Sequence, residues 1–145
     1  MLYKLGAKVN RDQQGEVVFL DLWNSSITDA GLMKFETRTK LQGLHLASAQ
    51  ITDEGLVHIK GLTGLQMLIL NETQITDTGL DNLTGLANLQ FLSLERCTQI
   101  TDEGLVHLKG LTALKELRLG GTEVTDRSEE HTSELQSQAY LVCRL

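Results

Sequence analysis

The chain has 145 residues, of which 41% are hydrophobic, and its formal net charge is −6. This length accommodates a single domain with a buried core. It contains neither an apolar run long enough to span a membrane nor an export signal, which favours a cytoplasmic location. Along the sequence no cluster of Lys and Arg supplies the local positive field that a nucleic acid or an anionic membrane requires, so we expect neither as a partner.

A short motif recurs after an initial segment of residues 1–16. Ile-Thr-Asp begins at Ile27, Ile51, Ile75 and Ile100, and Val-Thr-Asp begins at Val124, so the spacings are 24, 24, 25 and 24 residues. An L-x-x-L-x-L frame precedes each motif, over residues 17–22, 41–46, 65–70, 89–94 and 114–119. These five units predict a repeat array over residues 17–126, of which the last unit is incomplete.

The apolar period changes within each unit, and the third unit shows this clearly. Leu68 and Leu70 alternate with Ile69, which predicts a short strand with the two leucines turned inward. Thr76 and Asp77 then supply side-chain oxygens suited to capping a helix. Leucines at a three-residue spacing form the buried face of that helix: Leu80, Leu83 and Leu86.

The repeated frame resembles that of the leucine-rich-repeat family. The fourth unit, with Cys97, looks like the cysteine-containing subclass, whereas the other units look like the threonine-type repeats of bacterial arrays. Residues 5–18 resemble the lead-in that caps such arrays. The resemblance covers about residues 5–126 and implies an α/β fold, a right-handed solenoid with short parallel strands on its concave face and short helices on its convex face.

The first unit departs from the frame in two places. Arg38 stands where later units have Leu62, Leu86 and Leu111, and Phe35 replaces a Leu or Ile. We expect looser packing in this unit. The arginine is expected to cover the core with its aliphatic stem while its charged head reaches water.

The frame stops abruptly after Asp126. Residues 127–137 and 140–145 resemble, in order, the translation of a widely used sequencing-library adapter interrupted by a short index. We therefore expect residues 127–145 to be a non-native or disordered tail on a piece of a longer array. No chemistry is assigned to His131 or Cys143 in this tail.

The sequence contains no phosphate-binding loop, nucleophile elbow or zinc-protease motif, so we expect neither an enzyme nor a cofactor. His58 and His107 occupy the same slot of two related units, and repetition explains them without a metal site. Helix capping likewise explains the row of Thr-Asp pairs. Cys97 is interpreted as a small buried residue of its repeat type.

The outward residues of the strands form three columns across the expected concave face. Their apolar members stand out, because these positions need no apolar side chain for the core. The candidate partner-binding residues are Phe19, Asp21, Trp23, His45, Met67, Ile69, Asn71, Phe91, Ser93, Glu95, Glu116 and Arg118. Five strands about 4.8 Å apart make a face of roughly 240 Å², well below the about 800 Å² per partner of a standard interface.

Three functions remain open. The apolar columns favour a protein–protein interaction module that uses the concave face of the array. Alternatives are a structural spacer within a longer multidomain protein and, because the cysteine-type repeat resembles such receptors, the substrate-receptor part of a ubiquitin-ligase-like assembly. The sequence identifies neither the protein partner nor the oligomeric state.

Overall fold

The computed structural model describes residues 2–125, so the predicted tail at residues 127–145 lies outside the described residues. Its central feature is a six-stranded sheet in which the strands follow one another in chain order. The strands are β1 (Lys8–Arg11), β2 (Val17–Asp21), β3 (Gly43–His45), β4 (Met67–Ile69), β5 (Phe91–Ser93) and β6 (Glu116–Arg118). Strand β1 pairs with β2 in the antiparallel direction, and the remaining pairs are parallel.

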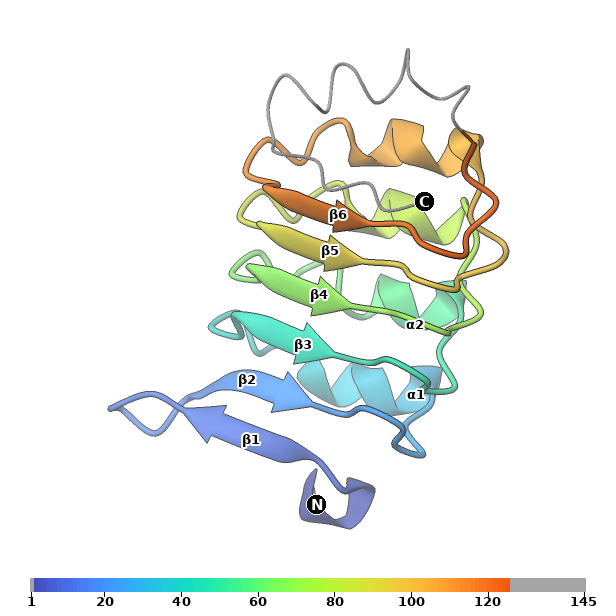
Figure 1. Cartoon of the computed structure of the whole chain (residues 1–145). Coiled ribbons are helices and arrows are strands. Elements are labelled where there is room, and N and C mark those ends of the chain that lie inside the picture. Colours follow the sequence, from blue (N-terminus) through green and yellow to red (C-terminus); the bar gives the residue numbers. More distant parts are fainter. Residues whose placement is uncertain (1, 126–145) are drawn as a thin grey trace.

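Short helices lie on the opposite side from the strands (Figure 1). They are α1 (Asp29–Leu32), η2 (Met33–Phe35), α2 (Asp53–Val57), η3 (Gly79–Leu83) and η4 (Asp102–Leu108), with η1 (Leu2–Leu5) ahead of the sheet. We call the two sides the strand face and the helix face. Neighbouring helices pack with their axes about 8–10 Å apart, whereas neighbouring strands lie about 4.8 Å apart. Because each repeat contributes to both faces, this difference in spacing curves the solenoid and makes the strand face concave.

Several of the predicted helices are short 3₁₀ helices, and η3 ends before the last leucine of its predicted buried face. The η elements are 3₁₀ helices, and η3 ends at Leu83, so Leu86 lies beyond it in the turn that follows. Leu86 is nevertheless fully buried. A 3₁₀ helix repeats every three residues, which suits leucines spaced by three.

The core is a column of leucines that runs through all the repeats. Leu44 and Leu68 pair in register across β3 and β4, and both are fully buried. Leu70 is also buried, whereas Ile69 is only half-buried. The predicted alternation of strand β4 is therefore confirmed, and each of the strands β2 to β6 contributes a buried leucine to one shared core.

The aspartates of the Thr-Asp pairs connect neighbouring repeats. The Asp53 carboxylate accepts the backbone N–H of Thr76 at 2.7 Å and the Thr76 hydroxyl at 2.6 Å. Equivalent bonds join three further pairs: Asp29 and Thr52, Asp77 and Thr101, Asp102 and Thr125. We call this set the Thr-Asp ladder, because each carboxylate forms a rung between two successive units.

The predicted capping role of the Thr-Asp pairs is therefore right only for some threonines. Thr52 and Thr101 each accept a backbone N–H two residues later, as expected of a helix N-cap. The prediction is wrong for Thr76 and Asp77 at η3, where Thr78 is the N-cap residue and makes no side-chain cap bond. The Asp77 carboxylate instead holds Thr101 of the next repeat.

The ladder also explains the glycines that stand two residues after Asp53, Asp77 and Asp102. A Cβ atom added to Gly79 would lie 2.1 Å from Oδ1 of Asp53 in the preceding repeat. The same approach is 2.3 Å between Gly55 and Asp29 and 2.3 Å between Gly104 and Asp77. Any side chain at these glycines would displace the carboxylate, so the Asp and Gly of the repeated motif depend on each other across the repeat boundary.

Candidate binding surface

A groove of about 330 Å³ crosses the first column of the strand face. The ring of Phe19 lies over Gly43, where a Cβ atom would come within 2.2 Å of Cδ2 of Phe19. Met67 and Phe91 continue the column on β4 and β5, in register with Gly43. Met67 is 37% exposed although it is apolar. The groove thus has an apolar floor that the packing of the leucine core does not require.

A column of glutamines borders this floor at the start of the strands. Gln42, Gln66 and Gln90 line the groove, and none of the residues that line it is charged. Their backbones are linked, because the N–H of Gln66 donates to the carbonyl of Gln42 and that of Gln90 donates to Gln66. Sequence reasoning did not select these residues, since they precede the strands. Their recurrence in one slot of three successive units was the available signal.

The second column places charged and polar groups beside the apolar floor. His45 Nδ1 lies 3.1 Å from a carboxylate oxygen of Asp21 on the neighbouring strand. At the C-terminal edge of the sheet, the Arg118 guanidinium lies 5.1 Å from the centre of the Phe91 ring, and its Nε donates to Glu116 at 2.7 Å. The predicted residues Glu116 and Arg118 therefore rim the floor at Phe91.

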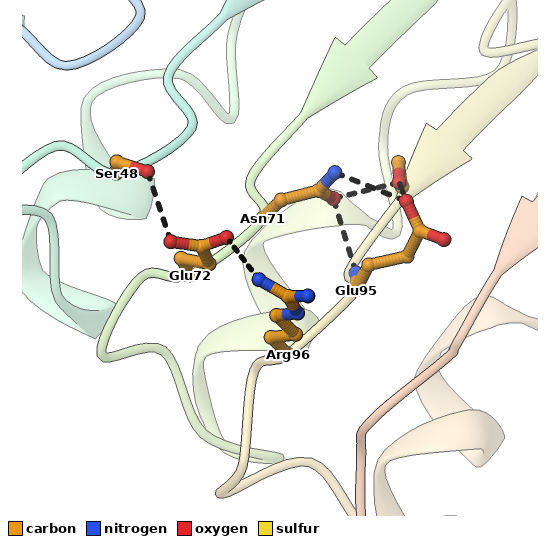
Figure 2. A network of polar contacts seen from close by, with 6 residues as sticks. Ser48, Asn71, Glu72, Glu95 and Arg96 are labelled. Atoms are coloured by element: carbon orange, nitrogen blue, oxygen red, sulfur yellow. Dashed lines mark hydrogen bonds and ion pairs between the residues drawn. The ribbon is translucent and has the colours of Figure 1, made fainter.

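Ser93 and Asn71 form a polar cluster with Glu95. Ser93 is only 1% exposed, and its hydroxyl donates to Oδ1 of Asn71 at 2.6 Å. The Asn71 amide donates to Glu95 at 3.2 Å and accepts the Glu95 backbone N–H at 3.0 Å (Figure 2). Ser93 is therefore buried beneath Asn71 and Glu95 and is not available to contact a partner. Asn71 and Glu95 are half-buried.

A second polar row lies beside this cluster. Glu72 accepts the Ser48 hydroxyl at 3.2 Å and the Arg96 guanidinium at 3.1 Å (Figure 2). These three residues adopt a left-handed backbone, with φ between 55° and 58°. The fifth unit has Gly121 in that conformation, with φ of 74°. The row gives the strand face a charged margin made of residues from three successive repeats.

Trp23 is the most exposed large hydrophobic residue that the structure describes, with 64% of its surface accessible. Its backbone N–H donates to Asp21 at 3.1 Å. It does not line the groove at Phe19, so the structure separates it from the apolar floor although both belong to the predicted set.

Cys97, His58 and His107 are each engaged in contacts within the fold. Burial raises the pKa of the Cys97 thiol, which donates to the Leu70 carbonyl at 3.1 Å. His58 and His107 each lie against a carboxylate of the preceding repeat, Glu36 and Asp81 respectively. Within residues 2–125 no group of three or more His, Cys, Asp or Glu side chains is arranged to hold a metal ion.

No helix in the described part of the chain is long and apolar enough to cross a membrane.

Comparison with known proteins gives a consistent fold. The family described as leucine-rich repeat matches residues 38–59 and 85–108. An internalin from Listeria monocytogenes, inlF, is similar in structure with a TM-score of 0.55 and 18% identity over 86% of this chain. Internalin C2 from the same organism has a TM-score of 0.50 and 20% identity over 86% of this chain.

The chain spans 46% of the inlF chain and 78% of the internalin C2 chain. No curated protein matches the chain in sequence. At these identities the likeness concerns the fold.

Proposed function

Because the chain is a leucine-rich-repeat protein, we propose that it is a protein-binding module whose strand face holds a segment of a partner protein. The observation that carries the proposal is the groove over Phe19, Met67 and Phe91. Apolar side chains at these outward positions do not contribute to the leucine core. Burying them against a partner would recover about 25 cal/mol for each Å² removed from water.

The borders of the groove suit a polypeptide. The amide side chains of Gln42 and Gln66 offer both donors and acceptors beside the apolar floor, and Gln90 offers its N–H donors while its Oε1 accepts from Lys115 at 3.1 Å. Such groups match the alternating N–H and C=O groups of an extended backbone, while an apolar side chain of the partner rests on Met67 and Phe91. We therefore expect the bound segment to carry an aromatic or aliphatic anchor between uncharged residues.

The groove alone is too small for a stable complex. A standard interface buries about 800 Å² on each partner, more than one groove of this kind supplies. Trp23, which follows β2, and the charged residues Glu95, Glu116 and Arg118 on or next to β5 and β6 extend this surface. We propose that they contact the flanks of the partner, where charged pairs add specificity and contribute little to affinity. The proposed activity is binding and includes no catalytic step.

The test uses a library of random 12-residue peptides displayed on phage and selected on the 145-residue chain. Selected peptides are synthesised and titrated against the wild type and the double variant Met67→Ser, Phe91→Ser. We expect the variant to bind roughly tenfold or more weakly, because a central apolar anchor loses its support. Circular dichroism spectra of the two proteins should coincide, because neither position belongs to the core.

A matched control removes apolar surface from the helix face instead. Val57 and Val106 are 43% and 48% exposed, so Val57→Ser, Val106→Ser is a comparable change at a distance from the groove. This control should bind the selected peptides within twofold of the wild type. Equal binding by all three proteins, or the absence of any selectable peptide, would contradict the proposal and favour a spacer role.

A further inference from the structure

A second cavity lies at the N-terminal end of the solenoid, away from the strand face. It has a volume of about 320 Å³ and lies between η1 and the helices of the first repeat. Its floor is apolar and is formed by Leu2, Leu5, Ile27 and Phe35. Ligand cavities of this size are small and typically combine an apolar floor with a few polar groups that fix orientation.

Cations from two separate parts of the sequence line this cavity. Lys4, Lys34 and Arg38 line it, and no acidic side chain is among the lining residues that the structure describes. Residues 2–40 contain six basic and five acidic side chains, against five and ten in residues 41–125, so the N-terminal end is the less acidic part of the described chain. The fold thus creates a local positive site at one end of an otherwise acidic solenoid.

Arg38 is the unusual member of this group. The corresponding slot of the later repeats holds Leu62, Leu86 or Leu111, and each of these leucines is buried. Arg38 is half-buried, and its Nε is buried without a hydrogen-bond partner among residues 2–125. A buried N–H without a partner costs free energy that a leucine at this slot would avoid. A ligand acceptor would satisfy it.

We propose that this cavity binds an aliphatic carboxylate, with its chain on the apolar floor and its carboxylate at Arg38 and Lys4. A guanidinium presents two parallel N–H donors that match the two oxygens of a carboxylate. The apolar floor selects against inorganic anions, which have nothing to place on it. The absence of acidic residues from the lining selects against amines.

The experiment titrates sodium decanoate into the 145-residue chain by isothermal calorimetry, with 1-decanol as the neutral counterpart. We expect decanoate to bind with a Kd of about 0.1 mM, a modest free energy for each of its non-hydrogen atoms. Decanol should bind at least tenfold more weakly, because it has an apolar chain but no carboxylate for the cations. Decanol that binds as tightly as decanoate would overturn the proposal.

The decisive variant is Arg38→Leu, which installs the residue of the later repeats. We expect it to fold with an unchanged or higher urea midpoint and to bind decanoate about ten- to hundredfold more weakly, while its binding of decanol changes less than twofold. The matched control is Lys60→Leu, which removes one exposed cation outside the cavity and should leave the Kd unchanged. Wild-type affinity in Arg38→Leu, or an equal loss in Lys60→Leu, would overturn the proposal.

Discussion

The first repeat and the repeats that follow it share one sequence frame but pack differently. In the later units the slot after the helix holds a leucine that is at most 2% exposed, whereas in the first unit it holds Arg38 beside a cavity. Phe35 is buried one turn earlier but also lines this cavity, and the looser packing expected of the first unit stays a prediction. An interior unit has a complete repeat on each side, and only there does every slot require an apolar side chain.

The Thr-Asp ladder shows the same difference. Thr52 receives a carboxylate from the preceding unit and caps its own helix, but Thr28 has no preceding aspartate and makes no side-chain cap bond. A Cβ atom on Gly31 would meet only Ile27, whereas one on Gly79 would meet the Asp53 carboxylate. The threonine and glycine of the repeated motif therefore make their characteristic contacts only where another unit precedes them.

The largest expected effect comes from placing the first unit's arginine in an interior unit. Leu86→Arg forces a charge into a fully buried position. We expect a loss of more than about 4 kcal/mol in the free energy of unfolding, measured by urea titration with far-ultraviolet circular dichroism. A stability within about 1 kcal/mol of the wild type would show that interior and end units tolerate the same side chains.

A smaller effect is expected from Gly79→Ala. The added methyl group displaces the Asp53 carboxylate, which then loses its bonds to Thr76, so we expect a destabilisation of about 2 kcal/mol. The matched change Gly31→Ala should cost less than about 1 kcal/mol, because only the side chain of Ile27 has to move. The same urea titration compares them, and equal costs would contradict the proposed dependence of this glycine on the ladder.

The smallest effect separates two threonines that look identical in the sequence. Thr52→Val removes a cap bond and the hydroxyl bond of one rung, while the backbone N–H bond to Asp29 remains, and this should cost about 1 kcal/mol. Thr28→Val removes neither and should lie within about 0.5 kcal/mol of the wild type. Thermal unfolding followed by circular dichroism measures both. If Thr28→Val proved as costly as Thr52→Val, the first unit would be equivalent to the interior ones.

Much of the fold could be predicted because the same apolar pattern recurs in several units of the sequence. The inward orientation of Leu68 and Leu70 and the outward orientation of Ile69 depend only on the alternation within a strand. The position of the apolar floor at Phe19, Met67 and Phe91 depends on the register of the strands, which the period already determines.

Other features could not be predicted from the sequence of a single unit, because they depend on side-chain contacts between units. The aspartates looked like helix caps, because a cap is local in sequence, whereas the partner of Asp53 is 23 residues away. Ser93 looked like a surface residue, because the alternation of a strand cannot reveal that Asn71 and Glu95 close over it. The cations at Arg38 and Lys4 were not recognised as a cluster, because folding alone brings them together.

The Thr-Asp ladder also affects how the number of repeats in the gene for this protein can change. The fourth unit has one extra residue, so Asp77 and Thr101 are 24 residues apart instead of 23, yet their bonds of 2.8 and 2.5 Å match those of the other rungs. The additional residue lies in the turn between Cys97 and Ile100. Because every rung joins adjacent units through the same residue types, duplication or deletion of one whole unit by unequal recombination places an aspartate opposite an equivalent threonine and glycine. Array length can therefore drift between generations without requiring new contacts at the joint.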